Sequence, residues 1–76
     1  FIRIYLKPQG EKADMDEPLV LKKEATVEDL CKNLHKDFLN KFKYARIWGE
    51  SADHPNQKVG KSHELVDEDI VSIITN

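Results

Sequence analysis

The chain has 76 residues, enough for one small domain, and its formal net charge is −2. That balance supplies no global basic field for nucleic-acid binding, and no stretch approaches the roughly 20 apolar residues of a membrane span. The single cysteine excludes an internal disulfide and favours a reducing, cytosolic setting.

The first strand is predicted from strict alternation over residues 1–6, which Pro8 and Gly10 then interrupt. Residues 11–18 form a polar, acidic loop, and the segment Leu19–Lys22, apolar over its first three residues, predicts a second strand paired with the first in a hairpin. The first strand directs three aliphatic side chains to one face, Ile2, Ile4 and Leu6. Its other face carries Arg3 and Tyr5.

A helix is predicted to begin after Thr26, a favourable N-cap residue with Asp29 three positions later in a variant of the capping box. Acidic side chains lie in its first turn, where the helix dipole favours them. The apolar residues that follow Thr26 repeat at helical spacing and are expected to form one stripe, Val27, Leu30, Cys31, Leu34 and Phe38.

Three further segments complete the predicted sheet. Residues 43–48 alternate again, residues 57–60 form at most a short edge strand, and residues 70–75 form the last strand. The inward side chains of this half of the chain are expected to be Ala45, Ile47, Leu65, Val71 and Ile73.

The order strand, strand, helix, strand, short strand, strand predicts an α+β fold. Because the helix stripe has nothing else to bury against, the helix must cover one face of a mixed sheet. That is the β-grasp, or ubiquitin-like, arrangement, with the first and last strands central and parallel and the third strand beside the last. Residues 1–76 are predicted to be a single domain, and both ends resemble boundaries within a longer protein.

The tripeptide Gly60-Lys61-Ser62 resembles the end of a phosphate-binding P-loop. The full pattern needs a glycine five residues earlier, where Pro55 stands, and a helix afterwards, which the sequence does not indicate. A turn glycine with polar neighbours is therefore the preferred interpretation.

Metal and catalytic sites have little support. Cys31 and His35 are one helical turn apart, but Cys31 lies in the middle of the apolar stripe and has no second cysteine to join it. The same position argues against Cys31 as a nucleophile. Residues 67–69 are adjacent carboxylates, which form an acidic turn more readily than a catalytic pair. No catalytic residue, cofactor site or metal site is predicted.

The sheet face opposite the helix is predicted to be the working surface. Its outward residues combine aromatic rings with guanidinium groups beside Ile74, and two lysines flank it. Such a set suits base stacking or a protein hot spot, and the alternative is packing against a neighbouring domain. The predicted surface comprises Arg3, Tyr5, Lys41, Lys43, Tyr44, Arg46 and Trp48.

Five stretches carry a family resemblance, Ile2–Tyr5 with Lys7-Pro8, Thr26–Asp29, Lys43–Gly49, His54–Gly60 and Asp67–Val71. Together they resemble the TGS domain of the developmentally regulated GTP-binding protein (DRG) family of Obg-related GTPases, over essentially the whole chain. The Tyr-Ala-x-x-Trp-Gly and His-Pro-x-Gln-Lys-Val-Gly patterns are the most specific, whereas the helix start and the acidic turn are shared with other TGS domains.

The resemblance implies a parent GTPase whose G domain carries the P-loop, GTP and magnesium, with no cofactor in this domain. It also implies a cytoplasmic location, association with translating ribosomes and a dedicated regulatory partner protein. TGS domains are regarded as regulatory modules that bind nucleotides or RNA. The chain is therefore expected to be a non-catalytic module that contacts RNA, the ribosome, a partner protein or the parent's G domain.

Two other readings are open. A TGS domain of an aminoacyl-tRNA synthetase or of an alarmone synthetase/hydrolase would share the helix start and the acidic turn. A free ubiquitin-like modifier or sulfur carrier needs a C-terminal Gly-Gly, whereas this chain ends Ile74-Thr75-Asn76.

Overall fold

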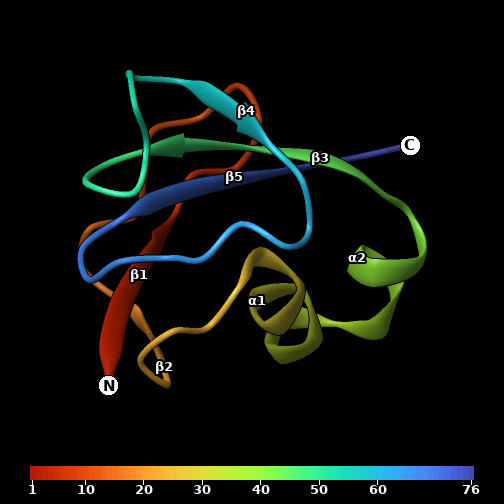
Figure 1. Cartoon of the computed structure of the whole chain (residues 1–76). Helices are drawn as coiled ribbons and strands as arrows, with labels where there is room; N and C mark the ends of the chain where they lie inside the picture. Colours follow the sequence, from red (N-terminus) through yellow and green to blue (C-terminus); the bar gives the residue numbers. More distant parts are fainter.

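The computed structural model describes residues 1–76 and contains one five-stranded sheet and two short helices (Figure 1). The strand order is β2-β1-β5-β3-β4, with β1 and β5 parallel at the centre and the other neighbours antiparallel. This is the predicted β-grasp fold. The elements are β1 (Ile2–Leu6), β2 (Leu19–Leu21), α1 (Val27–Leu34), α2 (Lys36–Asn40), β3 (Phe42–Trp48), β4 (Gln57–Val59) and β5 (Ile70–Thr75).

The core lies between α1 and the sheet face that it covers (Figure 1). The side chains of Ile4, Val27 and Leu30 are fully buried there, and each such burial stabilises the fold by roughly 1.5–3 kcal/mol. The structure confirms the inward residues expected in the second half of the chain. Buried are Ala45, Ile47, Leu65 and Val71, and Ile73 packs against them half-buried.

The helix begins as the capping box predicts but ends earlier than the apolar spacing predicts. The Asp29 N–H donates to Thr26 Oγ1 at 3.4 Å, and the Thr26 N–H donates to Asp29 Oδ2 at 2.9 Å. His35 then adopts an extended conformation, and its Nδ1 accepts a hydrogen bond from the Asp37 N–H at 3.1 Å, which starts α2. Neither helix is long and apolar enough to cross a bilayer.

The break at His35 makes the predicted position of Phe38 wrong. The apolar stripe ends at Leu34, and Phe38 belongs to α2 with 36% of its surface exposed. Spacing alone counted Phe38 as part of the stripe because it lies eleven residues after Val27, close to three helical turns. The histidine cap, which periodicity does not reveal, redirects the chain before that turn is completed.

The outward face of β5 is more covered than predicted. Ile74 lies on the face opposite α1, as expected, but only 8% of its surface is exposed, and its neighbour Ser72 is 3% exposed. β5 is the central strand, so side chains of β1 and β3 flank its outward residues on both sides. The exposed part of this face therefore belongs to the flanking strands.

Candidate functional site

Strand register places the outward side chains in rows across the sheet. Tyr5 of β1 pairs with Ile70 of β5, which pairs with Trp48 of β3. The next rows join Arg46 with Ser72 and with Lys58 of β4, and Tyr44 with Ile74. With Lys7, which follows β1, these rows define what we call the aromatic–basic face, Tyr5, Lys7, Tyr44, Arg46, Trp48 and Lys58.

Cations lie over two of the aromatic rings on this face. The Tyr44 ring has Lys58 Nζ at 4.6 Å and Arg46 Cζ at 5.3 Å from its centroid. The Trp48 ring has Lys7 Nζ at 5.4 Å. All three distances fall within the range of a cation–π interaction, which is favourable by about 0.5–1 kcal/mol at exposed sites. The aromatic side chains therefore orient the positive charges of the face.

Lys7 and Trp48 also explain why the centre of the face is covered. β5 lies between β1 and β3, so the Lys7 side chain crosses β5 to reach the Trp48 ring. Ser72, on the outward side of β5 between these two residues, is buried. Trp48, Tyr5 and Tyr44 are half-buried rather than fully exposed.

The face carries positive charge without negative charge. Lys7, Arg46 and Lys58 are its cations, and no outward strand residue among its rows is an Asp or Glu. The Arg46 guanidinium also donates to the carbonyl of Asn56 at 3.2 Å, which ties the loop before β4 to β3. A chain whose overall charge is −2 thus presents a locally basic surface.

Arg3, although predicted as part of the surface, is held by the acidic turn. Its Nη2 donates to Asp67 Oδ2 at 3.2 Å and to Glu68 Oε1 at 3.0 Å. The hydrogen bond from Arg3 lowers the pKa of the Asp67 carboxyl, and the hydrogen bond to Asp67 raises the pKa of Arg3. Two carboxylates therefore offset the positive charge at this end of the sheet.

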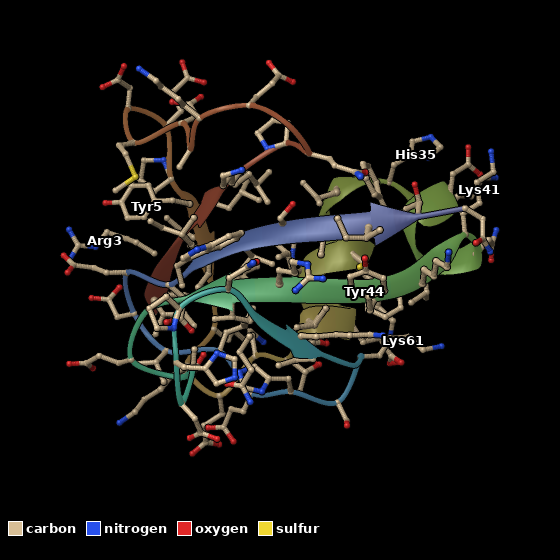
Figure 2. The ribbon with its side chains drawn as sticks, turned by 90° about the horizontal axis from the view of Figure 1, so that it is seen from above. Arg3, Tyr5, His35, Lys41, Tyr44 and Lys61 are labelled. Atoms are coloured by element: carbon tan, nitrogen blue, oxygen red, sulfur yellow. The ribbon has the colours of Figure 1, made fainter.

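The predicted surface residues spread along the whole length of the sheet (Figure 2). Arg3 and Tyr5 lie at one end, Lys41 at the other, and Tyr44 between them. Lys41 and Lys43 are exposed, and a register shift between Phe42 and Tyr44 falls at Lys43. The structure brings Tyr5, Tyr44, Arg46 and Trp48 onto one face and leaves Lys41 and Lys43 at its margin. Arg3 instead pairs with Asp67 and Glu68.

Lys7 and Lys58 are members of this face that the sequence prediction missed. Lys7 continues the period-two alternation of Arg3 and Tyr5 by one more step, past the end of β1. Lys58 is the middle residue of β4, flanked by half-buried residues, so alternation also assigns it outward. The same period-two alternation, extended past the end of β1 and over β4, would have identified Lys7 and Lys58 from the sequence.

Ser51, His63 and Asp69 come together but do not form a catalytic triad. The Ser51 hydroxyl donates to the buried carboxylate of Asp69, and His63 Nε2 lies 2.9 Å from Ser51 Oγ. A triad needs the carboxylate on the far nitrogen of the histidine, with the serine proton given to the imidazole. Asp69 also accepts from the Val66 N–H at 2.9 Å, so this cluster joins two turns.

The tripeptide Gly60-Lys61-Ser62 lies at the N-terminus of α1, but it does not leave the N–H groups there open for a phosphate. The Glu28 N–H donates to the Lys61 carbonyl, and the Val27 N–H donates to the His63 carbonyl, both at 3.0 Å. A phosphate site requires these first-turn N–H groups to be free for the anion. Gly60 therefore belongs to a turn that caps the helix with carbonyl oxygens.

Cys31 and His35 do not face one another across a metal site. Cys31 is fully buried in the core, as predicted, and this burial raises the pKa of its thiol. His35 is exposed at the break between the helices, where its Nδ1 caps α2. No three His, Cys, Asp or Glu side chains gather with the geometry of a metal site.

The fold and this surface define a class, a β-grasp module whose most distinctive feature is a basic, aromatic sheet face. The family model of the TGS domain matches residues 2–75, and the chain belongs to that family. It is a TGS domain of the kind found in DRG-family GTP-binding proteins, as its sequence resemblance indicated. TGS domains are non-catalytic.

Three curated relatives illustrate the match. The chain is 58% identical to an uncharacterised GTP-binding protein of Methanocaldococcus jannaschii, over 97% of this chain and 19% of that protein. It is 55% identical to the developmentally regulated G-protein 3 of Arabidopsis thaliana, over 95% of this chain and 20% of that protein. It is 47% identical to developmentally regulated GTP-binding protein 1 of Xenopus laevis, over 96% and 20% respectively. The chain thus spans about a fifth of the length of these relatives.

Proposed function

We propose that this chain is the docking domain of a longer GTPase and that its aromatic–basic face binds single-stranded RNA. The observation that supports this function is the set of cations held over aromatic rings on a face without carboxylates. Single-stranded RNA presents phosphates to cations and unstacked bases to aromatic rings, so it contacts both kinds of side chain on the face.

The two aromatic clusters have different roles in this proposal. Arg46 and Lys58 both lie over the Tyr44 ring, so Tyr44 positions them and their outer N–H groups bind phosphate. Trp48 and Tyr5 share a row through Ile70, and a base stacks on the Trp48 ring when Lys7 moves from it to a phosphate. Tyr44 is thus a positioning residue, whereas Trp48 contacts the base.

The surrounding charges restrict how RNA approaches. Asp67 and Glu68 lie with Arg3 at one end of the sheet, and Lys41 and Lys43 lie toward the other end. A bound strand therefore runs from the Trp48 row toward Lys43, away from the acidic turn. Exposed lysines at that margin add contacts to phosphate that do not depend on sequence.

In the parent protein, we infer, a separate G domain binds GTP with magnesium, and this domain brings the GTPase to RNA on the ribosome in the cytoplasm. The relatives named as GTP-binding proteins are about five times longer than this chain, which leaves room for such a domain. A regulatory partner protein and the G domain itself are the competing occupants of the face. The salt dependence of binding distinguishes RNA from these two occupants, because contacts with protein depend on salt less than contacts with phosphate do.

The test is fluorescence anisotropy of a labelled oligouridine of about 12 nucleotides, titrated with the 76-residue chain at low and high salt. We expect weak, salt-sensitive binding that Lys58→Glu weakens at least about fivefold, with a shallower salt slope. Lys36→Glu is the matched control, because Lys36 is an exposed lysine on α2, away from the face. Equal effects of the two substitutions, or no binding at low salt, would refute RNA as the ligand.

A further inference from the structure

A groove at the edge of the sheet is lined by residues of β2, of α1 and of the segment that joins them. Its volume is about 710 Å³, and its apolar lining comprises Phe1, Val20, Leu21 and Ala25. Val20 is 60% exposed, and no other large apolar side chain within the strands and helices is as exposed. It has no role in the core or in the proposed RNA site.

The backbone at this groove is also open. β2 is an edge strand, because its only neighbour in the sheet is β1. The Tyr5 and Lys7 N–H groups donate to carbonyls at the β5 side, so the alternate residues Ile2 and Ile4 of β1 bond to β2. Their partners are Leu21 and Leu19, which leaves the N–H and C=O of Val20 directed to the open edge.

The charges at the groove favour an acidic occupant. Lys22, Lys23 and Lys32 line it, and neither Lys22 nor Lys23 takes part in an ion pair. Two carboxylates also line the groove, Glu24 and Asp29, but the Asp29 carboxylate accepts hydrogen bonds from Thr26 at the start of α1. The free lysines therefore attract negative charge to the end of β2, where the chain turns toward the helix.

We propose that the edge of β2 and this groove bind an extended, acidic segment of a partner protein by strand addition. The N–H and C=O of Val20 at the open edge are placed to pair with an extended backbone, which a helix cannot supply. The Val20 side chain, on the face of β2 opposite α1, contacts an apolar side chain of that segment, and Lys22 and Lys23 pair with its carboxylates. This second site is separate from the RNA-binding face and does not depend on it.

The probe is a synthetic peptide, Asp-Glu-Val-Ile-Val-Ile-Asp-Glu, with blocked ends, added to the ¹⁵N-labelled chain and followed by amide chemical shifts. We expect saturable shifts at Leu19–Lys22 and along α1, with nuclear Overhauser contacts between the peptide backbone and Val20. The same peptide with lysine at its four acidic positions should bind at least threefold more weakly. Absence of shifts at millimolar peptide, or shifts confined to the aromatic–basic face, would overturn the proposal.

Two variants separate strand addition from nonspecific contact. Val20→Pro removes the open N–H without breaking a bond to β1, and it should lower the affinity for the peptide at least tenfold. Val20→Thr keeps that N–H and should leave the affinity nearly unchanged. If the proline variant does not fold, the double substitution Lys22→Glu with Lys23→Glu tests the charges and should lower the affinity for the acidic peptide at least threefold. Unchanged binding in these variants, or peptide-independent pairing of two copies through β2, would contradict the assignment.

Discussion

The backbone N–H of Arg3 donates to Asp67 Oδ1 at 2.6 Å, and the Arg3 guanidinium donates to the other oxygen of the same carboxylate at 3.2 Å. The two residues are 64 positions apart in sequence. One carboxylate thus fixes both the backbone and the side chain of β1 at the turn that precedes β5. Side-chain contacts hold the beginning of the parallel pair together, in addition to its ladder of backbone hydrogen bonds.

The first prediction concerns acid sensitivity. The pKa of Asp67 in the folded chain lies below its ordinary value of 3.8, because Arg3 donates hydrogen bonds to the carboxylate. Between these two pKa values the unfolded chain binds more protons than the folded chain. The contribution of the Asp67–Arg3 interaction to stability is therefore complete above about pH 4 and is lost as the pH falls through the folded pKa. Thermal unfolding should show Asp67→Asn less stable than wild type at pH 7, with the gap closing at lower pH.

Asp53→Asn is the control for this pH series, because the Asp53 carboxylate takes part in no ion pair. Its difference from wild type should be small at pH 7. The Asp29 carboxyl, whose pKa is also lowered by its bonds to Thr26, contributes equally to both proteins and cancels in the comparison. A gap for Asp67→Asn that stays constant down to pH 2 would show that the ion pair is not the source of the effect.

The second prediction concerns Gly49, where a side chain has no space. Gly49 adopts φ +144, and a Cβ there would overlap Oδ1 of the buried Asp69. Gly49→Ala should therefore lower the free energy of unfolding by at least about 2 kcal/mol, from backbone strain and displacement of that carboxylate together. Urea denaturation measures the loss.

Two other glycines separate strain from overlap. Gly10 has φ +78 with open space around it, so Gly10→Ala should cost only the left-handed conformation, about 1–2 kcal/mol. Gly60 has no positive φ, and no atom lies within 4 Å of the position that a Cβ would take, so Gly60→Ala should change stability by less than about 0.5 kcal/mol. Equal losses at Gly49 and Gly10 would show that Asp69 tolerates the added methyl group.

The third prediction concerns Cys31. Burial raises the pKa of its thiol above the ordinary value of 9.0, and the side chain is fully enclosed by the core. A thiol reagent at pH 8 should label the native chain far more slowly than the urea-unfolded chain. Cys31→Ser should cost about 1–3 kcal/mol, because its hydroxyl would enter an apolar site without a partner. Equal labelling rates in the two states would contradict the buried position.

The fold was largely predictable because its signals are local. Alternation in β1 and β3 and the Thr26 capping box are properties of short segments, and the structure confirms each of them. The early end of α1 was not predictable from periodicity, because His35 caps α2 with its ring nitrogen while Phe38 keeps the spacing of the stripe. A side-chain hydrogen bond decided where the helix stopped.

The candidate surface was only partly predictable, because its members depend on contacts between strands. Strand alternation placed Tyr44, Arg46 and Trp48 on one face. It did not show that Arg3 is bound by Asp67 or that Lys7 crosses β5 to Trp48. Those contacts join residues that are far apart in sequence, and they depend on side-chain length and strand order together.

The fourth prediction concerns nucleotide binding at the tripeptide Gly60-Lys61-Ser62. The first N–H groups of α1 already donate to the Lys61 and His63 carbonyls, and the position five residues before Gly60 is Pro55. Adding GTP with magnesium should leave the amide spectrum of the chain unchanged. Saturable shifts around Gly60 at micromolar nucleotide would refute this prediction.

The most direct test of the proposed function uses the fluorescence of Trp48, the only tryptophan of the chain. If a base stacks on its ring, adding oligouridine at low salt should quench the emission in a saturable way, and raising the salt should reverse the quenching. Lys58→Glu should shift the titration to higher RNA concentration, whereas Lys36→Glu should leave it near that of wild type. Emission that does not change while RNA binds would contradict the assignment of Trp48 and of the aromatic–basic face as the RNA-binding surface.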